Sequence, residues 1–129
     1  MSTFLGAFNN HLIDFINDLL IVFPNDIDLK TVKKAISTLS KINPRAIIRM
    51  WQEYSNKYTF QIEQGDISFF IENEYDKELK KLEDSDDVNK IIERLREPIR
   101  NMDAKNKDKA MKYIQNLTKI SKLYYANSK

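Results

Sequence analysis

The sequence contains no cysteine, two glycines, three prolines and a single histidine among its 129 residues. Without cysteine, disulfide bonds, thiol catalysis and cysteine-ligated zinc or iron–sulfur centres are excluded. So few glycines and prolines argue against a β-sandwich with many turns and against a long flexible linker. Hydrophobic residues (42%) and charged residues (31%) are close to globular averages, which argues against a disordered chain. The composition therefore predicts a helical globular protein.

We expect neither a leader nor a membrane span in the N-terminal part of the chain. It lacks the basic segment and the cleavage pattern of a secretory signal. The longest apolar stretch, residues 4–23, contains the polar side chains Asn9, Asn10, His11, Asp14, Asn17 and Asp18. A bilayer-spanning helix would tolerate so many polar groups poorly. We therefore expect a core helix here and a protein that is not secreted.

Apolar residues recur every three to four positions along most of the chain, which is typical of amphipathic helices. Helices are expected over residues 3–22, from Asp26 or Asp28 to residue 42, and over residues 44–62, 67–73, 86–96 and 103–125, with a polar helical stretch near residues 75–82. The sequence thus predicts an all-α fold, a compact bundle of five to six helices. One domain is expected to span residues 1–129.

Capping and turn residues predict several of the helix boundaries. Asn43 is expected to cap a helix whose first residue is Pro44, a favoured position for proline. Residues 59–62 alternate like a strand but have no obvious partner strand, so we predict that this helix continues through them. Gly65 is expected to end it.

His11 is the single histidine, and Asp14 follows it at helical spacing, as a general base would require. No serine or cysteine nucleophile motif and no second histidine accompanies the pair. We interpret His11 as a surface side chain beside a carboxylate. The sequence therefore predicts no catalytic residue, no enzyme activity and no cofactor.

An acidic segment offers oxygen ligands for a divalent cation through Glu83, Asp84, Asp86 and Asp87. It lacks the glycine-punctuated alternation of an EF-hand loop. We interpret it as a solvated loop whose negative charge favours the start of the next helix. No metal site is predicted.

The C-terminal region is rich in lysine. Lys105, Lys109, Lys112 and Lys119 fall within less than a quarter-turn of the expected helix, on the side away from its apolar residues. Such a row can follow the phosphates of nucleic acid or of anionic lipid headgroups. A solvated lysine face has the same sequence pattern, and no arginine is interleaved with the row. These lysines are nevertheless the best candidates for nucleic-acid binding.

Aromatic side chains are abundant for a chain of this size. Trp51, Tyr54 and Tyr58 form a row that suits a core better than a platform for stacked bases. The phenylalanines of the first helix also suit the core, but the supply is large for a small domain. We therefore predict a homodimer formed through the first helix, with Phe4, Phe8 and Phe15 at its interface.

Several short motifs carry a resemblance to a known group of proteins. They are Phe8-Asn9-Asn10, Phe23-Pro24-Asn25-Asp26, Asn43-Pro44-Arg45, Trp51 and the run from Gly65 to Phe70. Over residues 8–82 the chain resembles short helical proteins of large double-stranded DNA viruses of protists, of the marseillevirus and mimivirus type. The resemblance implies a viral protein in the virion or in the host cytoplasm. It carries over no catalytic or binding residue.

Two hypotheses of function follow. The leading hypothesis is a non-enzymatic, self-associating helical interaction protein that acts in the virion or on host factors. The alternative is a nucleic-acid-binding accessory protein that uses the lysine-rich C-terminal helix. The expected partners are a second copy of the chain, a viral or host protein, and nucleic acid.

Overall fold

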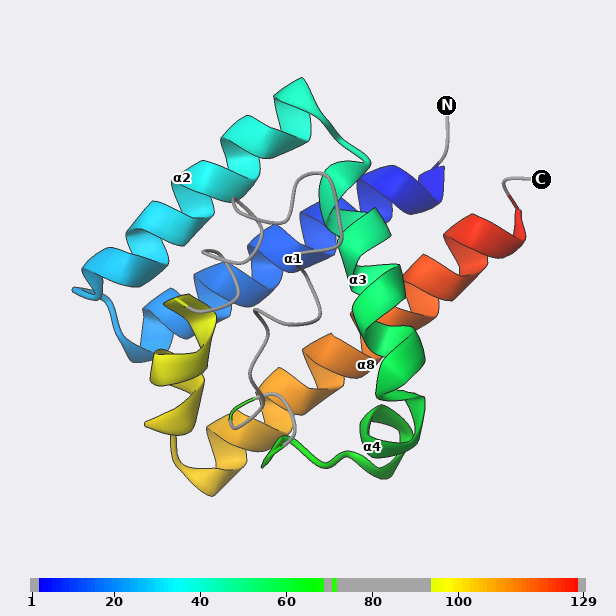
Figure 1. Cartoon of the computed structure of the whole chain (residues 1–129). Coiled ribbons are helices and arrows are strands. Elements are labelled where there is room, and N and C mark those ends of the chain that lie inside the picture. Colours follow the sequence, from blue (N-terminus) through cyan, green and yellow to red (C-terminus); the bar gives the residue numbers. More distant parts are fainter. Residues whose placement is uncertain (1–2, 69–70, 72–93, 128–129) are drawn as a thin grey trace.

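The computed structural model describes residues 3–68, 71 and 94–127, and over these residues the fold is all-α (Figure 1). The helices are α1 (Thr3–Val22), α2 (Ile27–Ile42), α3 (Ala46–Lys57), α4 (Thr59–Gln64) and α8 (Ala104–Ala126). Residues 94–100 are helical as well. The predicted all-α class is confirmed, and α1 has the bounds that its periodicity predicts. The helices expected near residues 67–82 and 86–96 lie mostly outside the described residues.

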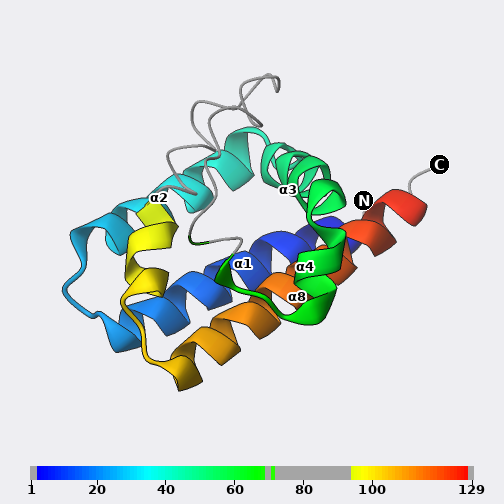
Figure 2. The same cartoon turned by 60° about the horizontal axis from the view of Figure 1, so that its bottom comes forward.

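α1 is the central helix of the arrangement. It packs against α2 on one side and α8 on the other, and both neighbours run antiparallel to it (Figures 1 and 2). α3 crosses the same layer and contacts α1, α2 and α8. The start of α1 and the end of α8 lie at the same end of the layer (Figure 1). Within the described residues, no helix combines the length and apolar character that crossing a membrane requires.

The core lies where the apolar stripes of these helices meet. Its fully buried aliphatic side chains come from every major helix and from residues 94–100: Ile16, Leu29, Val32, Ile36, Ile48, Ile99, Ile114 and Leu117 are each 0% exposed. Burying one such side chain stabilises the fold by roughly 1.5–3 kcal/mol before conformational entropy is counted. A polar contact also joins α1 to the turn before α3, because the Asn9 side-chain amide donates to the Pro44 carbonyl at 3.1 Å.

Aspartates cap the two helices that flank α1. The Asp26 carboxylate accepts a hydrogen bond from the backbone N–H of Leu29 at 3.0 Å, and that of Asp103 accepts one from Asn106 at 2.9 Å. Each bond satisfies one of the N–H groups that the first turn of a helix leaves free. Gly65 ends α4 with φ +72°, in the left-handed region that glycine adopts without strain, as predicted.

Three predicted boundaries are wrong. Asn43 closes α2 instead of opening α3, because its N–H donates to the Leu39 carbonyl at 2.7 Å, and α3 begins only at Ala46. The long helix predicted next is interrupted at Tyr58, which separates α3 from α4. Helical conformation also continues through Pro98 to residue 100. Pro98 has no N–H to donate, but the backbone N–H of Asn101 still donates to the Glu97 carbonyl at 3.2 Å.

Candidate functional site

The buried side of α8 determines which of its side chains face solvent. Ala110, Ile114, Leu117 and Tyr124 are at most 6% exposed and form the inner stripe that the sequence predicts. Side chains on the opposite side of the helix must therefore point away from the core. The orientation of the C-terminal lysines follows from this packing.

Buried polar contacts with α3 fix the rotation of α8 more tightly than apolar packing alone. The indole Nε1–H of Trp51 donates to the Thr118 hydroxyl at 3.0 Å, and that hydroxyl donates to the Ile114 carbonyl at 2.9 Å. The Ser121 hydroxyl donates to the Gln52 side-chain oxygen at 2.8 Å. Directional bonds between buried groups are costly to break, so α8 is held in one register against α3.

The four predicted lysines all lie on the outward side of α8. Lys105, Lys109, Lys112 and Lys119 are exposed, and none of them forms an ion pair with another described residue. At 1.5 Å per residue the row extends for about 21 Å along the helix. We call these residues the α8 lysine row. Their spacing correctly predicts a shared face, whereas their binding role stays a prediction.

A polar aromatic cluster joins α8 to α1 beside this row. The Tyr113 hydroxyl donates to the Asp18 carboxylate at 2.5 Å. Its ring stacks on Phe15, with centroids 5.0 Å apart and planes 14° apart, and lies 4.8 Å from the His11 ring. The pKa of Tyr113 is raised to about 12. Burial of the phenol is the largest cause, and the hydrogen bond to Asp18 and the negative charge of Asp18 add to it. Tyr113 therefore stays a neutral donor at physiological pH.

This cluster and the α8 lysine row together line an open hollow between α1 and α8. Its lining residues are His11, Asp18, Lys109, Lys112, Tyr113 and Asn116. Two ammonium groups and one carboxylate give the hollow a positive balance, and the carboxylate is held toward Tyr113. The sequence analysis missed Asp18 and Tyr113, because the two residues are 95 positions apart and no motif connects them.

His11 occupies a different environment from the one that the sequence predicts. Its side chain is half-buried against Tyr113 and is not a freely exposed group beside Asp14. The Nε2 atom is buried without a hydrogen-bond partner among the described residues. General-base catalysis requires a ring that is oriented by a partner and reaches a substrate proton. His11 has no such partner in the described part of the chain.

The described residues contain no group of three histidine or acidic side chains that is placed to hold a metal ion. The acidic segment with Glu83, Asp84, Asp86 and Asp87 lies outside residues 3–68, 71 and 94–127.

The aromatic residues that motivate the predicted dimer are largely used within one chain. Phe8 is 0% and Phe15 2% exposed, whereas Phe4 is only partly buried. Phe8 packs beside Trp51, which in turn lies next to Tyr54, so the aromatic row of α3 belongs to the core as predicted. Assigning Phe8 and Phe15 to a dimer interface is wrong for this fold, because packing against α3 and α8 already covers both rings.

Comparison with protein-family models, with curated proteins and with solved structures finds no match to this chain. Function therefore has to be inferred from the chemistry of the surfaces described above.

Proposed function

We propose that this protein is a non-enzymatic nucleic-acid-binding protein that contacts the phosphate backbone through the α8 lysine row. One observation carries the proposal: four exposed lysines without ion pairs among the described residues share one face of α8. Lysines in such a row neutralise phosphates and release counterions, which drives association. A face of about 21 Å can follow about six base pairs of a duplex.

The surroundings of the row favour phosphates over a lipid surface. A helix that binds at a membrane surface inserts apolar side chains beside its basic ones. Between Lys105 and Lys119 no large apolar side chain is exposed, and Leu123 is the first one beyond the row. The neighbouring groups are instead the polar ones of the hollow, such as the exposed side-chain amide of Asn116. An amide N–H can donate a hydrogen bond to a phosphate oxygen.

Two features support a role without catalysis. Serine, threonine and cysteine are absent from the residues that line the hollow, and burial, together with the hydrogen bond to Asp18, raises the pKa of Tyr113 and keeps its phenol protonated. His11, which is the candidate base, presents a buried Nε2. A nucleophile activated by an adjacent base is the usual requirement for hydrolytic or transfer chemistry.

The test is the equilibrium binding of a short DNA duplex, measured by fluorescence anisotropy at about 50 and about 200 mM salt. Four phosphate contacts predict a loss of affinity of about 100-fold over this range. The variant Lys109→Glu with Lys112→Glu should weaken binding at least tenfold and reduce the salt dependence. Lys109→Arg with Lys112→Arg keeps the charge and should bind as the parent does. Lys57→Glu on α3, which changes the net charge by half as much, tests whether a charge reversal away from the row has the same effect. Unchanged affinity in the glutamate variant would sink the proposal.

A second candidate function, self-association, is favoured by exposed isoleucines at the α1–α2 turn. Ile21 is 76% and Ile27 77% exposed, on either side of that turn. Neighbouring exposed apolar side chains are a common feature of protein contacts. If a second copy covers them, sedimentation equilibrium will show a dimer, and Ile21→Asp with Ile27→Asp will convert it to a monomer. A parent protein that is monomeric at high micromolar concentration contradicts this candidate.

From the resemblance of its short motifs to proteins of large DNA viruses of protists, we propose where either function would operate. Under this proposal the chain acts in the virion or in the host cytoplasm, on viral nucleic acid or on viral or host proteins. Fractionation of purified virions, with mass spectrometry for this chain, tests the setting. Absence of the chain from both virions and infected-cell cytoplasm contradicts it.

A further inference from the structure

A second row of lysines lies on α2. Lys30, Lys33, Lys34 and Lys41 are all exposed, and none pairs with an acidic side chain among the described residues. At 100° per residue they fall within about 100° of the helix circumference and extend for about 16 Å along its axis. The opposite side of α2 is buried through Leu29, Val32 and Ile36. We call these four residues the α2 lysine row.

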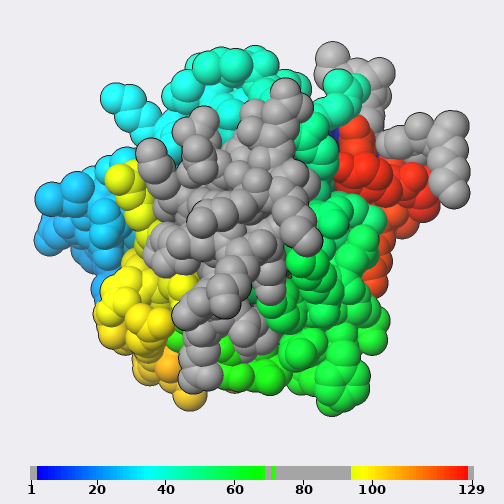
Figure 3. Space-filling view, viewed as in Figure 1, coloured from blue at the N-terminus to red at the C-terminus, as the bar shows by residue number. Residues whose placement is uncertain are grey.

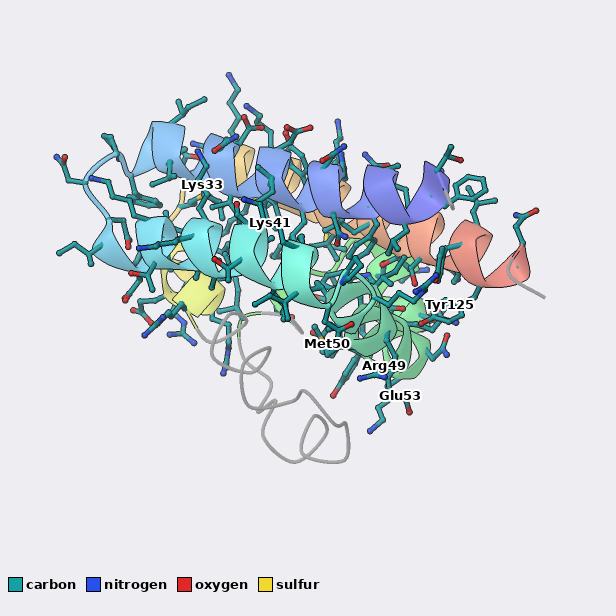
Figure 4. The ribbon with its side chains drawn as sticks, turned by 90° about the horizontal axis from the view of Figure 1, so that it is seen from above. Lys33, Lys41, Arg49, Met50, Glu53 and Tyr125 are labelled. Atoms are coloured by element: carbon teal, nitrogen blue, oxygen red, sulfur yellow. The ribbon has the colours of Figure 1, made fainter. Side chains whose placement is uncertain are left out.

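The charge around the α2 lysine row is more uniform than that around α8. Residues 29–52 contain no aspartate or glutamate, while Arg45 and Arg49 add positive charge toward α3. The two acidic residues at the start of α2 are already engaged: Asp26 caps the helix, and Asp28 lies 3.9 Å from Arg94. Figure 4 shows Lys33 and Lys41 on α2, followed by Arg49 on α3.

The two lysine rows lie on opposite sides of α1. α2 and α8 flank that helix and run in the same direction, so the rows are roughly parallel (Figures 1 and 2). In the space-filling view, α2 and the C-terminal end of α8 reach the surface at different edges of the molecule (Figure 3). Packed helices are separated by 8–10 Å, which places the α2 and α8 axes about 16–20 Å apart. Each row lies on the solvent-exposed side of its own helix, with α1 between the two helices.

We propose that the α2 lysine row binds the phosphate backbone of a second duplex, so that one protein molecule bridges two nucleic-acid segments. This inference rests on the proposed binding through α8. The occupant is identified by charge complementarity. Four ammonium groups without an ion pair among the described residues, in a stretch without acidic residues, match a polyanion, and a duplex presents phosphates along a line. Bridging of this kind brings separate segments together without reading their sequence.

The test is a capture assay with two duplexes. One duplex is attached to beads, a second carries a fluorophore, and the labelled duplex is retained only if protein binds both. The variant Lys33→Glu with Lys41→Glu should reduce retention at least tenfold, and the number of duplexes bound by one protein molecule should fall from two to one, because only the α8 lysine row still binds. Lys33→Arg with Lys41→Arg should bridge normally. Circular dichroism of each variant checks that the helices are intact.

The possible results separate this inference from the proposed function. Retention by the Lys33→Glu, Lys41→Glu variant that equals that of the parent overturns it and points to bridging by a dimer through two α8 faces. Single-duplex binding by the parent without any retention also overturns it, but leaves binding through α8 intact. No binding of a single duplex removes both.

Because Ile27 and Ile42 are exposed at the ends of α2, binding to phosphatidylserine vesicles is measured in parallel. Loss of vesicle binding in the variant without any loss of bridging overturns the inference in favour of a lipid surface.

Discussion

α2 and α8 look alike in sequence but are held in different ways. Both are amphipathic helices with four lysines on the outward side and an aspartate N-cap, and both pack against α1. α8 is fixed by buried hydrogen bonds, such as that from Trp51 to Thr118, and by the contact of Tyr113 with Asp18. The side chains that α2 buries, Leu29, Val32 and Ile36, are all apolar.

The difference shows that a charge pattern alone does not define a surface. The α8 lysine row borders a hollow that contains a carboxylate and aromatic rings from α1, whereas the α2 lysine row has no acidic neighbour along its own stretch of chain. Hydrogen bonds specify the rotation of a helix by direction, while apolar contacts specify it by shape and area. We therefore expect α8 to be the more rigidly oriented of the two.

The largest expected effect is the loss of stability when a buried side chain of α2 or α8 is shortened. Ile114 on α8 and Ile36 on α2 are both 0% exposed. Replacement of either by alanine should lower the free energy of unfolding by about 2–5 kcal/mol. The loss should be greater for Ile114 than for Ile36, because α8 packs against α1, α3 and α4, which limit collapse of the cavity. Urea denaturation measures both values. Lys112→Ala, on the outer side of α8, should change stability by less than about 0.5 kcal/mol. Equal losses for the inner and outer positions would contradict the packing described.

The next effect concerns the polar anchor that α8 has and α2 lacks. Thr118→Val should cost about 1–3 kcal/mol, because the Trp51 N–H would remain buried without an acceptor. The emission of the single tryptophan reports the same change directly. The double variant Thr118→Val with Trp51→Phe serves as the control. If the two groups interact, its loss of stability will be smaller than the sum of the two single losses. Additive losses would contradict this anchor.

A smaller effect tests the feature that the two helices share. Asp26→Ala at α2 and Asp103→Ala at α8 should each lower stability by about 0.5–2 kcal/mol, since each removes one N-cap hydrogen bond. Asparagine at either position can accept the same bond and should restore most of the loss. Thermal unfolding followed by circular dichroism provides the comparison. If Asp26→Ala has no effect while Asp103→Ala does, the start of α2 depends on something other than its cap.

The smallest effect is a pH dependence that belongs to α8 alone. The pKa of Tyr113 is raised from 10.0 to about 12, first by burial and then by Asp18, so folding favours the neutral phenol. This stabilisation is complete below pH 10 and is lost as the pH rises from about 10 to about 12. The difference in stability between the parent and Tyr113→Phe should therefore shrink over that range. In Asp18→Asn the pKa should fall toward 10 in a spectrophotometric titration, and an unchanged value would contradict the role of Asp18.

Several parts of the fold are predictable from the sequence because their causes are local. The period of apolar residues locates α1 and the inner stripe of α8, Asp26 signals an N-cap, and Gly65 signals a helix end. Boundaries that depend on competition between neighbouring helices are less predictable. Asn43 suits the start of one helix and the end of another, and the choice depends on whether its N–H is used by α2.

The candidate site divides in the same way. The shared face of Lys105, Lys109, Lys112 and Lys119 follows from helical geometry, so the sequence alone identifies it. The α2 lysine row also has a local signal, because residues 29–52 contain no acidic residue. The cluster of His11, Asp18 and Tyr113 had no local signal, because it forms only where α1 meets α8.

The sequence by itself determined the all-α class, the buried stripes and the outward lysines of α8, because helical periodicity acts within one segment. Only the tertiary structure decided that Phe8 and Phe15 belong to the core of a single chain, since burial depends on which helices cover them. It also decided that the two lysine rows lie on opposite sides of α1. Which helices become neighbours is set by packing between segments that are distant along the chain, and no local pattern records it.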